Sequence, residues 1–317
     1  MFLLILFGAV GLAIFEPGVN WQNAFWWSIV TLTTVGYGDI APTTFGGRIV
    51  GGVIMVLGIG ILGMFTATIA SVFVEKKLKA NRGMNTFDFE NHTIICEWNH
   101  RAADILNELR ADRRMANAPV VLIANIAEKP LDDENLFFIR GNVDEENLQR
   151  ANIGGAKTVV ILGNDSLEAN ARDAQVVLAA LTVESVNPDV YSVVELVSER
   201  NVPHCERANV NEIIVGSEFS SRLISRAALD HGISKVMAEL LSSRVGSDLN
   251  QISVPAGLAG KPFIEVFTEM KRAHNAIILA IYNRKQESIV TNPNGDYLVA
   301  PDDQLVVISD SRNVKRN

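Results

Sequence analysis

Charge is scarce at the start of this 317-residue chain, and cysteine is scarce throughout. Residues 1–83 hold only eight charged side chains, with a net charge of +2, whereas the whole chain has a net charge of −8. Residues 84–317 therefore carry −10, which argues against non-specific binding to nucleic acid because that needs a basic surface. The two cysteines, Cys96 and Cys205, form no CxxC motif, and this favours reduced thiols in a cytosolic compartment.

Long apolar runs fill the weakly charged region. Residues 49–74 form a run of 26 residues without a charge, which is long enough to cross a bilayer. Lysines follow within residues 76–79, so the positive-inside tendency places this end and the rest of the chain in the cytoplasm. Residues 1–15 are also uncharged, but a signal peptide would need a basic start and an A-x-A cleavage site, which are absent. We therefore expect two spanning helices, the first of them short.

A third apolar stretch, residues 21–32, is too short to span and leads into TTVGYGD at residues 33–39. A short helix at membrane depth must be shielded by protein or line a water-filled cavity. Potassium is selected by rings of backbone carbonyls that replace its hydration shell, and TVGYG loops build such rings. The two glycines permit backbone angles that other residues avoid, so successive carbonyls can face one axis. The residues predicted to form this filter for K⁺ are Thr34, Val35, Gly36, Tyr37 and Gly38.

Residues 1–80 thus resemble the two-helix pore of potassium channels. One chain supplies one quarter of a filter, so the resemblance implies a homotetramer. We expect Trp26, Trp27 and Tyr37 to form an aromatic cuff that holds the loop open. The alternative is a plain glycine-containing turn between two helices, which would leave the position of the motif between two membrane helices unexplained.

Three glycines interrupt the second spanning helix at Gly58, Gly60 and Gly63. Gly58 lies 19 residues after Asp39, where channels of this type usually carry their gating glycine. Because glycine weakens a helix interior, we expect a gating hinge at Gly58, with Gly63 setting the packing lower down. Close helix packing at all three positions is the alternative.

Residues 81–92 are predicted to form a linker, after which short strands alternate with helices. The expected strands are residues 93–96, 120–124, 137–139, 159–162, 190–196 and 212–215. The expected helices are residues 102–114, a helix from 145, and 169–183. This alternation predicts an α/β fold with a doubly wound, Rossmann-like parallel sheet. Ligands of such sheets bind beyond the carboxyl ends of the strands.

The loop after the first of these strands lacks the glycines of a dinucleotide site. The standard pattern is G-x-G-x-x-G, whereas residues 96–101 read CEWNHR. The acidic residue expected after the second strand, which would hold ribose, is replaced by Ala124 and Asn125. A cleft that binds NAD or ADP and a purely structural cleft both remain open, because Arg101 could hold a phosphate at a helix start. The candidate nucleotide-binding residues are Trp98, Asn99, His100, Arg101, Asn125 and Asn142.

The soluble half resembles the RCK domain, also called the KTN domain, which regulates potassium channels and transporters. The resemblance rests on GNVD at 141–144, LQRANI at 148–153, SRLISR at 221–226, IILAI at 277–281 and PDDQLVV at 301–307. It implies a Rossmann-like lobe at 93–218, crossover and dimerisation helices at 219–247, and a small α+β lobe at 248–317.

The resemblance also implies a possible calcium site. In calcium-gated members the ion is held by carboxylates near the end of the fifth strand and on the helix after the fourth. Glu195 falls on one such position, but Val197 replaces its companion. A solvated acidic rim is the alternative, since calcium needs several oxygen ligands. The acids that could complete a site are Asp165, Glu168, Asp173 and Glu199.

Gating rings of this family usually contain eight soluble domains for four pores, and this chain supplies one. An internal start at Met84 would provide soluble copies, as in the calcium-gated relative. The alternatives are a second RCK domain or a ring built differently.

The sequence therefore predicts a multi-pass potassium channel of the plasma membrane, gated by a ligand on its cytoplasmic domain, with no enzymatic activity. No arginine-rich helix is present, so we expect no steep voltage dependence. One alternative is a membrane-anchored nicotinamide oxidoreductase, which would leave the filter motif unexplained. The other is a regulatory subunit of a potassium transporter, a class that carries no pore.

Overall fold

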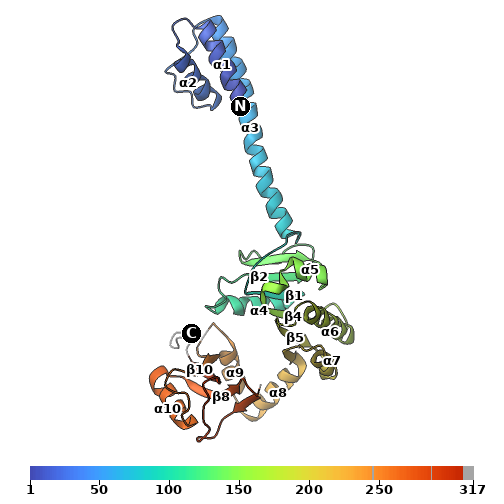
Figure 1. Cartoon of the computed structure of the whole chain (residues 1–317). Helices are drawn as coiled ribbons and strands as arrows, with labels where there is room; N and C mark the ends of the chain where they lie inside the picture. The colour runs from blue at the N-terminus through green and yellow to red at the C-terminus, as the bar shows by residue number, and fades with distance from the viewer. Residues whose placement is uncertain (245, 287, 310–317) are drawn as a thin grey trace. The chain divides into compact units, whose positions relative to one another are not determined.

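The computed structural model describes residues 1–309 except 245 and 287 (Figure 1). It divides into two compact units, Met1–Ala80 and Asn81–Asn317. The first is helical, and the second contains a six-stranded parallel sheet and a four-stranded antiparallel sheet. These are the three parts that the sequence predicts, so the predicted fold class is confirmed.

The first unit contains helices α1 (Phe2–Phe15), α2 (Trp21–Leu32) and α3 (Phe45–Asn81). Among the described residues, α3 is the one helix both long and apolar enough to cross a membrane, and α1 is apolar but shorter. The 37 residues of α3 rise about 55 Å, which exceeds the bilayer core of about 30 Å. The helix therefore continues beyond the hydrocarbon region.

The three helices share a small apolar core. Leu12 of α1, Trp27 of α2 and Ile54 of α3 are all buried in it. Gly8 makes the close approach possible, because a Cβ there would lie 2.1 Å from Cδ1 of Ile54. Glu16, just after α1, also ties the unit together, since its carboxylate accepts hydrogen bonds from the backbone and hydroxyl groups of Thr43 and Thr44.

The parallel sheet has the strand order β3-β2-β1-β4-β5-β6. Strands β2 and β3 are added on one side of β1 and strands β4 to β6 on the other, so the topological switch point lies between β1 and β4. Its strands are β1 (His92–Cys96), β2 (Val120–Ala124), β3 (Leu136–Arg140), β4 (Ala156–Ile161), β5 (Tyr191–Leu196) and β6 (Glu212–Val215). Its helices are α4 (His100–Ala111), α5 (Glu145–Arg150), α6 (Ala169–Val186) and α7 (Val202–Arg207). Helix α4 begins two residues earlier than predicted because the Asn99 side chain caps it, accepting from Ala102 N at 3.0 Å.

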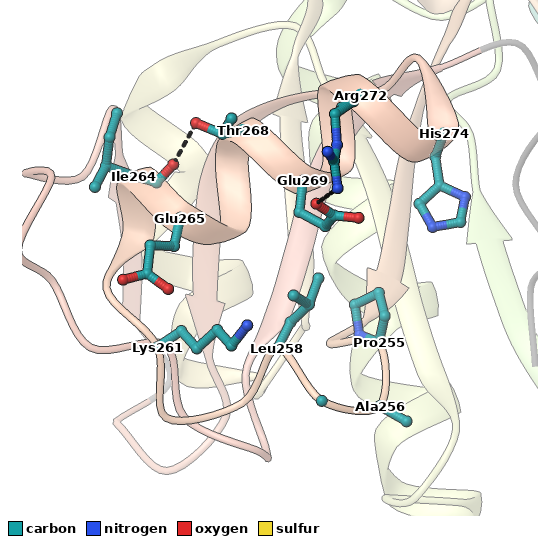
Figure 2. Close-up of a pocket in the computed structure, with 11 residues that line it drawn as sticks. Pro255, Ala256, Leu258, Lys261, Ile264, Glu265, Thr268, Glu269, Arg272 and His274 are labelled. Carbon is teal, nitrogen blue, oxygen red and sulfur yellow. Dashed lines mark hydrogen bonds and ion pairs between the residues drawn. The ribbon is translucent and has the colours of Figure 1, made fainter.

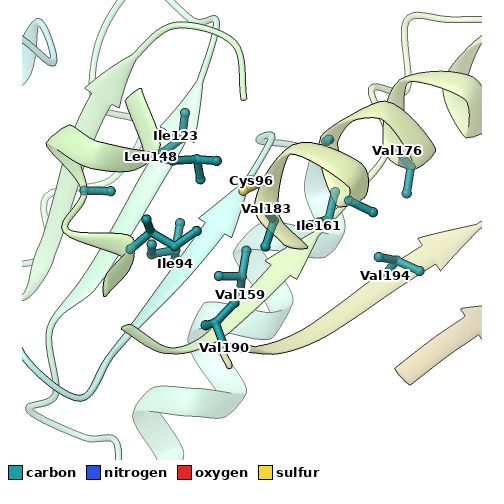
Figure 3. Packing of buried hydrophobic residues seen from close by; sticks show 14 of the residues in the cluster. Ile94, Cys96, Ile123, Leu148, Val159, Ile161, Val176, Val183, Val190 and Val194 are labelled. Carbon is teal, nitrogen blue, oxygen red and sulfur yellow. The ribbon is translucent and has the colours of Figure 1, made fainter. Parts of the chain in front are cut away.

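Both faces of this sheet are covered. Figure 3 shows one face, where Ile94 and Val159 of the strands meet Leu148 of α5 and Val183 of α6. A second cluster, centred on Leu106 of α4, covers the opposite face. The central strands β1 and β2 are buried at every position, as expected for parallel strands with helices on both sides.

The C-terminal lobe follows two amphipathic helices, α8 (Gly216–Leu229) and α9 (Ile233–Leu241), which contain no buried residue. Its antiparallel sheet has the order β7-β10-β8-β9. Its elements are β7 (Asp248–Ser253), α10 (Phe263–His274), β8 (Ile277–Asn283), β9 (Ser288–Thr291) and β10 (Gln304–Ser309). Helix α10 packs through Phe263, Val266 and Met270, which gives this lobe a core of its own.

Both cysteines are free thiols that are fully buried. Burial raises the pKa of Cys96 to about 12 and that of Cys205 to about 11. We therefore expect neither thiol to react with a maleimide at pH 8 in the native protein, because the reactive thiolate is almost absent. Both should react once the chain is unfolded in urea. Rapid labelling of either cysteine before unfolding, followed by mass spectrometry, would show that the assigned packing is wrong.

Candidate selectivity filter and ligand site

The backbone of the TVGYG loop alternates in handedness. Thr34, Gly36 and Gly38 have positive φ angles of 63°, 57° and 76°, whereas Val35 and Tyr37 do not. Such alternation turns successive carbonyls toward the same side of the chain. For a non-glycine residue such as Thr34 a positive φ is costly, and strain of this kind is concentrated at functional sites.

The N–H groups of the loop point back toward helix α2. Thr34 N donates to Thr31 O at 3.1 Å, and Val35 N and Gly36 N donate to Val30 O at 3.0 and 3.3 Å. These donors are thus satisfied by the end of α2, and within the described part of the chain no carbonyl of residues 34–38 accepts a backbone hydrogen bond. Free backbone carbonyls on one side of a loop are the ligands that a K⁺ filter requires.

The outer part of the loop is braced by Trp26. Its indole Nε1 donates to Asp39 Oδ2 at 3.1 Å, and its ring stacks on Tyr37 with centroids 6.1 Å apart. Trp27, which we expected in the same aromatic cuff, is instead 4% exposed and packs in the core between the helices. Adjacent residues on a helix face different directions, so one tryptophan braces the loop and the other anchors α2.

Gly58 lies against the end of α2. A Cβ at this position would be 2.8 Å from Leu32 Cδ1 and 3.3 Å from Leu32 O, so a larger residue would require the Leu32 side chain and the helix end to shift. Gly63, which we expected to set the packing, has no atom within 4 Å of such a Cβ in the single chain. Helix α3 is continuous through both positions. The structure thus gives Gly58 a packing role next to the filter, and the hinge stays a prediction.

At the carboxyl edge of the sheet, the predicted phosphate and calcium residues pair with each other. Arg101 Nε donates to Glu195 Oε2 at 2.7 Å, and its NH2 group donates to Asp165 Oδ1 at 2.6 Å. Arg172 NH1 and His100 Nδ1 also lie within 3.0 and 3.2 Å of the Asp165 carboxylate. Two arginines therefore face two carboxylates, and their formal charges cancel.

This pairing keeps the cluster charged at neutral pH. Burial alone would raise the pKa of Asp165, but the hydrogen bond from Arg101 and the charges of Arg101, Arg172 and His100 outweigh it, so the pKa lies below its usual value. Burial likewise opposes the charge of Arg101, yet Asp165 and Glu195 raise the pKa of its guanidinium. A phosphate would have to displace both carboxylates, so Arg101 is not the free anion site that the sequence suggests.

The remaining acids do not complete a calcium site. Asp173 is fully buried and accepts two backbone N–H bonds in the loop after β5, at 2.8 and 2.9 Å. Glu168 and Glu199 are exposed. Within the described residues, no group of three or more His, Cys, Asp or Glu side chains could hold a metal ion. In this arrangement Glu195 and Asp165 are paired with Arg101 and Glu168 is exposed, so the expected set is not assembled as a cation site while Arg101 lies between the two carboxylates.

A cleft of about 280 Å³ lies beside this cluster, at the carboxyl ends of β1 to β4 and against α6. Asn142 alone, of the six residues predicted to bind a nucleotide, is among those that line it. Asn99 is used to cap α4 and to donate to Gly163 O at 2.9 Å, and Trp98 packs against the core. Trp98, Asn99, His100, Arg101 and Asn125 are not among the residues that line this cleft, and their assignment to nucleotide binding stays a prediction.

Glu97 and Gln175 line the cleft, and sequence reasoning missed both. Glu97 has a φ of 76° and lies in the loop that carries glycines in dinucleotide-binding sheets, so this loop has a glycine-like backbone at a residue that is not glycine. The amide oxygen of Gln175 is buried without a hydrogen-bond partner. A carboxylate and a free amide oxygen suit a hydrogen-bond donor or cation better than a pyrophosphate, so the cleft does not fit a dinucleotide bound in the usual way.

A second hollow, of about 790 Å³, lies along α10 in the C-terminal lobe (Figure 2). Its charged side chains are of both signs, and Arg272 is paired with Glu269 at 2.9 Å. None of the residues predicted from the sequence as site residues lines it.

Comparisons with known proteins agree with this division. Residues 1–75 match a family described as ion channel, residues 88–194 the calcium-activated potassium channel slowpoke-like RCK domain, and residues 217–317 Castor and Pollux, part of voltage-gated ion channel. The calcium-gated potassium channel TvoK of Thermoplasma volcanium is 30% identical over 92% of this chain and 83% of its own length. The putative potassium channel protein YugO of Bacillus subtilis is 32% identical over 96% of this chain and 92% of its own.

Among solved structures, the human SLO3 gating ring aligns with this chain at a TM-score of 0.55 and 15% identity. The alignment covers 70% of this chain and 44% of the SLO3 chain. This likeness concerns the fold alone. A helical pore region followed by an RCK fold defines a membrane ion channel rather than an enzyme, which sets the oxidoreductase aside. More particularly, the chain belongs to the family of potassium channels that carry an RCK domain.

The unusual backbone of Glu97 gives a stability prediction. Glu97→Gly should raise the free energy of unfolding by about 1 kcal/mol, because glycine adopts a positive φ without the steric cost that other residues pay. The measurement is chemical unfolding of the detergent-solubilised channel. The matched control is Glu146→Gly within α5, which should destabilise by about 1 kcal/mol. A loss of stability in both variants would show that the contacts of the Glu97 side chain stabilise the fold by more than its positive φ angle costs.

Proposed function

We propose that this chain forms a homotetrameric, potassium-selective channel whose pore is controlled by ligand binding to the cytoplasmic RCK domain. The observation that carries the proposal is the filter backbone, with alternating φ angles and its first N–H groups bonded to α2. The assigned parts are the pore at 1–80, the linker at 81–92, the Rossmann-like lobe at 93–218, the crossover helices at 219–247 and the C-terminal lobe at 248–317.

The tetramer follows from what one chain leaves exposed. Val35 and Tyr37 of the filter are 54% and 68% exposed in the single chain, and positions Gly60 and Gly63 of α3 face open space. Four copies around one axis would place their carbonyls around the ion and cover part of these surfaces. The remaining apolar surface of α3, including Phe65 and Phe73, would meet membrane lipid.

The basic residues at the end of α3 support the orientation. Lys76, Lys77 and Lys79 follow the apolar run directly, which favours a cytoplasmic position for the RCK domain in the plasma membrane. A gating ring of eight such domains would need soluble copies started at Met84, or a second RCK domain. Met84 pairs with Ile139 through a backbone bridge, so a copy that starts there would keep this contact but lose Gly83.

The proposed ligand site is the carboxyl edge of the sheet, and Ca²⁺ is the ligand that we favour there. Glu195 and Asp165 share one guanidinium, so Arg101 occupies the place that a cation between them would take. Arg101 is long and can move away, whereas the two carboxylates would remain and repel a phosphate. The relative at 30% identity is named as calcium-gated, which supports the same choice. A nucleotide such as NAD or ADP is the second candidate.

Gating requires that the ligand bind the open and closed states differently, because tight binding alone shifts no equilibrium. A change at the sheet edge would move the linker at 81–92 and thus the end of α3. Bending of α3 near Gly58 would separate this helix from Leu32 at the end of α2. The proposed hinge is therefore placed where movement of α3 directly affects the support of the filter.

The filter assignment predicts loss of selectivity in Gly36→Ala. A methyl group meets no atom there, but the φ of 57° disfavours alanine, so the loop should rearrange. We expect the K⁺/Na⁺ permeability ratio, measured from reversal potentials in planar bilayers, to fall at least tenfold. The control is Gly52→Ala in α3, where a Cβ also meets no atom and the backbone is helical. Equal selectivity in the two variants would refute the filter assignment.

The ligand assignment predicts opposite effects for the two candidate ligands. In Arg101→Gln the guanidinium that competes with Ca²⁺ for the carboxylates of Glu195 and Asp165 is absent. The Ca²⁺ concentration that gives the half-maximal response should therefore fall about tenfold, equivalent to about 1.4 kcal/mol. The measurement is barium-sensitive K⁺ flux from liposomes over a Ca²⁺ titration, and Arg113→Gln is the control for the change in charge. If ADP alone alters the flux and Arg101→Gln abolishes that response, the nucleotide is the ligand instead.

A further inference from the structure

The segment between the membrane helix and the first strand is bound along the N-terminal lobe. Gly83 O accepts from Arg140 N at 3.1 Å, and Met84 forms an antiparallel bridge with Ile139 of β3. Farther along, Phe87 N donates to Arg150 O at 2.8 Å. The segment is therefore held to the end of β3 at Gly83 and Met84 and to the end of α5 at Phe87, rather than being a loose tether.

The Arg150 side chain fastens the start of this segment. Its NH2 group donates to Gly83 O at 2.7 Å and to Asn85 O at 3.0 Å. Two phenylalanines of the segment, Phe87 and Phe89, also pack on Phe137 of β3, with ring centroids 5.2 and 4.4 Å apart. Bonds from a charged donor are roughly twice as strong as neutral ones, so Arg150 is the main polar fastening.

Arg150 is in turn connected, through the side chain of Asn147, to the cleft of about 280 Å³ at the carboxyl edge of the sheet. Its NH1 group donates to Asn147 Oδ1 at 2.8 Å, and Asn147 Nδ2 donates to Asn142 O at 3.0 Å. Asn147 is buried, at 8% exposure, and Asn142 and Gly141 line the cleft. The orientation of the Asn147 amide is fixed by chemistry, because a guanidinium can only donate and a carbonyl can only accept.

The loop between β3 and α5 closely contacts this amide. Gly141 has a φ of 155°, and a Cβ at this position would lie 2.4 Å from Asn147 Nδ2. A shift of the loop would therefore press directly on the Asn147 amide. Because the amide is planar and rigid, displacing its Nδ2 end also displaces the Oδ1 end that holds Arg150.

We propose that Asn142, Asn147 and Arg150 form a relay that couples the cleft at the carboxyl edge of the sheet to the pore linker. The inference rests on the proposed function, because the relay would transmit the binding of a ligand at this edge. Occupation of the cleft shifts the β3–α5 loop, the Asn147 amide follows, and Arg150 changes its hold on Gly83 and Asn85. The signal thus reaches Gly83 and Asn85, two and four residues after the end of α3, without passing through the sheet core.

The relay is tested by hydrogen exchange of the backbone amides in the full-length channel in lipid nanodiscs. Arg150→Gln should speed exchange within the peptide covering residues 82–91 about tenfold, because the charged fastening is lost. Arg113→Gln, the same change at an exposed arginine of the same lobe, should leave it unchanged. Unchanged exchange in Arg150→Gln would show that Arg150 does not hold the linker.

Coupling to the cleft is tested by a double-mutant cycle. Thr182→Phe adds a ring at a residue that lines the cleft and should change linker exchange at least threefold. Asn147→Asp keeps the oxygen that Arg150 binds but replaces the donor to Asn142, so it should abolish the effect of Thr182→Phe while the linker stays protected. Additive effects, or no effect of Thr182→Phe alone, would overturn the relay.

The two hypotheses fail separately. Hydrogen exchange is measured without ion flux, so a channel found not to select K⁺ would refute the proposed function and leave the relay result valid. Asn147→Asp can be replaced by Asn147→Ser if it does not fold, as judged by the thermal unfolding of the solubilised protein. Serine is too short to span from Arg150 to Asn142, so its expected result is the same loss of coupling.

Discussion

A carbonyl oxygen that must face potassium points away from the protein around the loop, so it contributes little to holding that loop in place. The filter backbone therefore has to be held from behind, through its N–H groups and its side chains. Here three N–H groups of the loop donate to the end of α2, and Trp26 braces Tyr37 and Asp39. The rest of the pore unit serves this constraint, because Trp27 fixes α2 in the core and α3 packs against the same helix end at Gly58.

In the second unit, which begins at Asn81, charged groups satisfy one another in a similar way. The carboxyl edge of the sheet gathers Arg101, Arg172, Asp165 and Glu195 into a cluster whose charges cancel, so the edge is stable without a bound ion. A ligand that replaces one member of the cluster changes the balance of the others. The Asn142–Asn147–Arg150 relay begins in the adjacent cleft and ends on the linker, which gives such a change a short physical route to the pore.

The fold could be predicted from the sequence, and the loop proposed as the filter could be located in it, because both depend on local pattern. The strands came from short apolar runs, and the filter from TVGYG between two apolar helices. The ligand edge could not be predicted, because its contacts join residues far apart in the chain, such as Arg101 with Glu195. From sequence position alone, Arg101 was assigned to a phosphate and Glu195 to calcium, although the two side chains form an ion pair with each other. The available signal for Glu97 was its place in the loop after the first strand, where a dinucleotide site has glycines, but a glutamate there gave no sign of a positive φ angle.

The central claim is that a carbonyl-lined filter selects potassium and that the cytoplasmic domain controls access to it. The most direct test is the reversal potential of the unmodified channel in a planar bilayer, with K⁺ on one side and Na⁺ on the other. The account predicts a barium-blocked current that reverses far from zero, on the side set by K⁺, and whose open probability responds to Ca²⁺ on the RCK side. A barium-insensitive current that reverses near zero would contradict it, because equal passage of Na⁺ and K⁺ is incompatible with a filter built from these carbonyls.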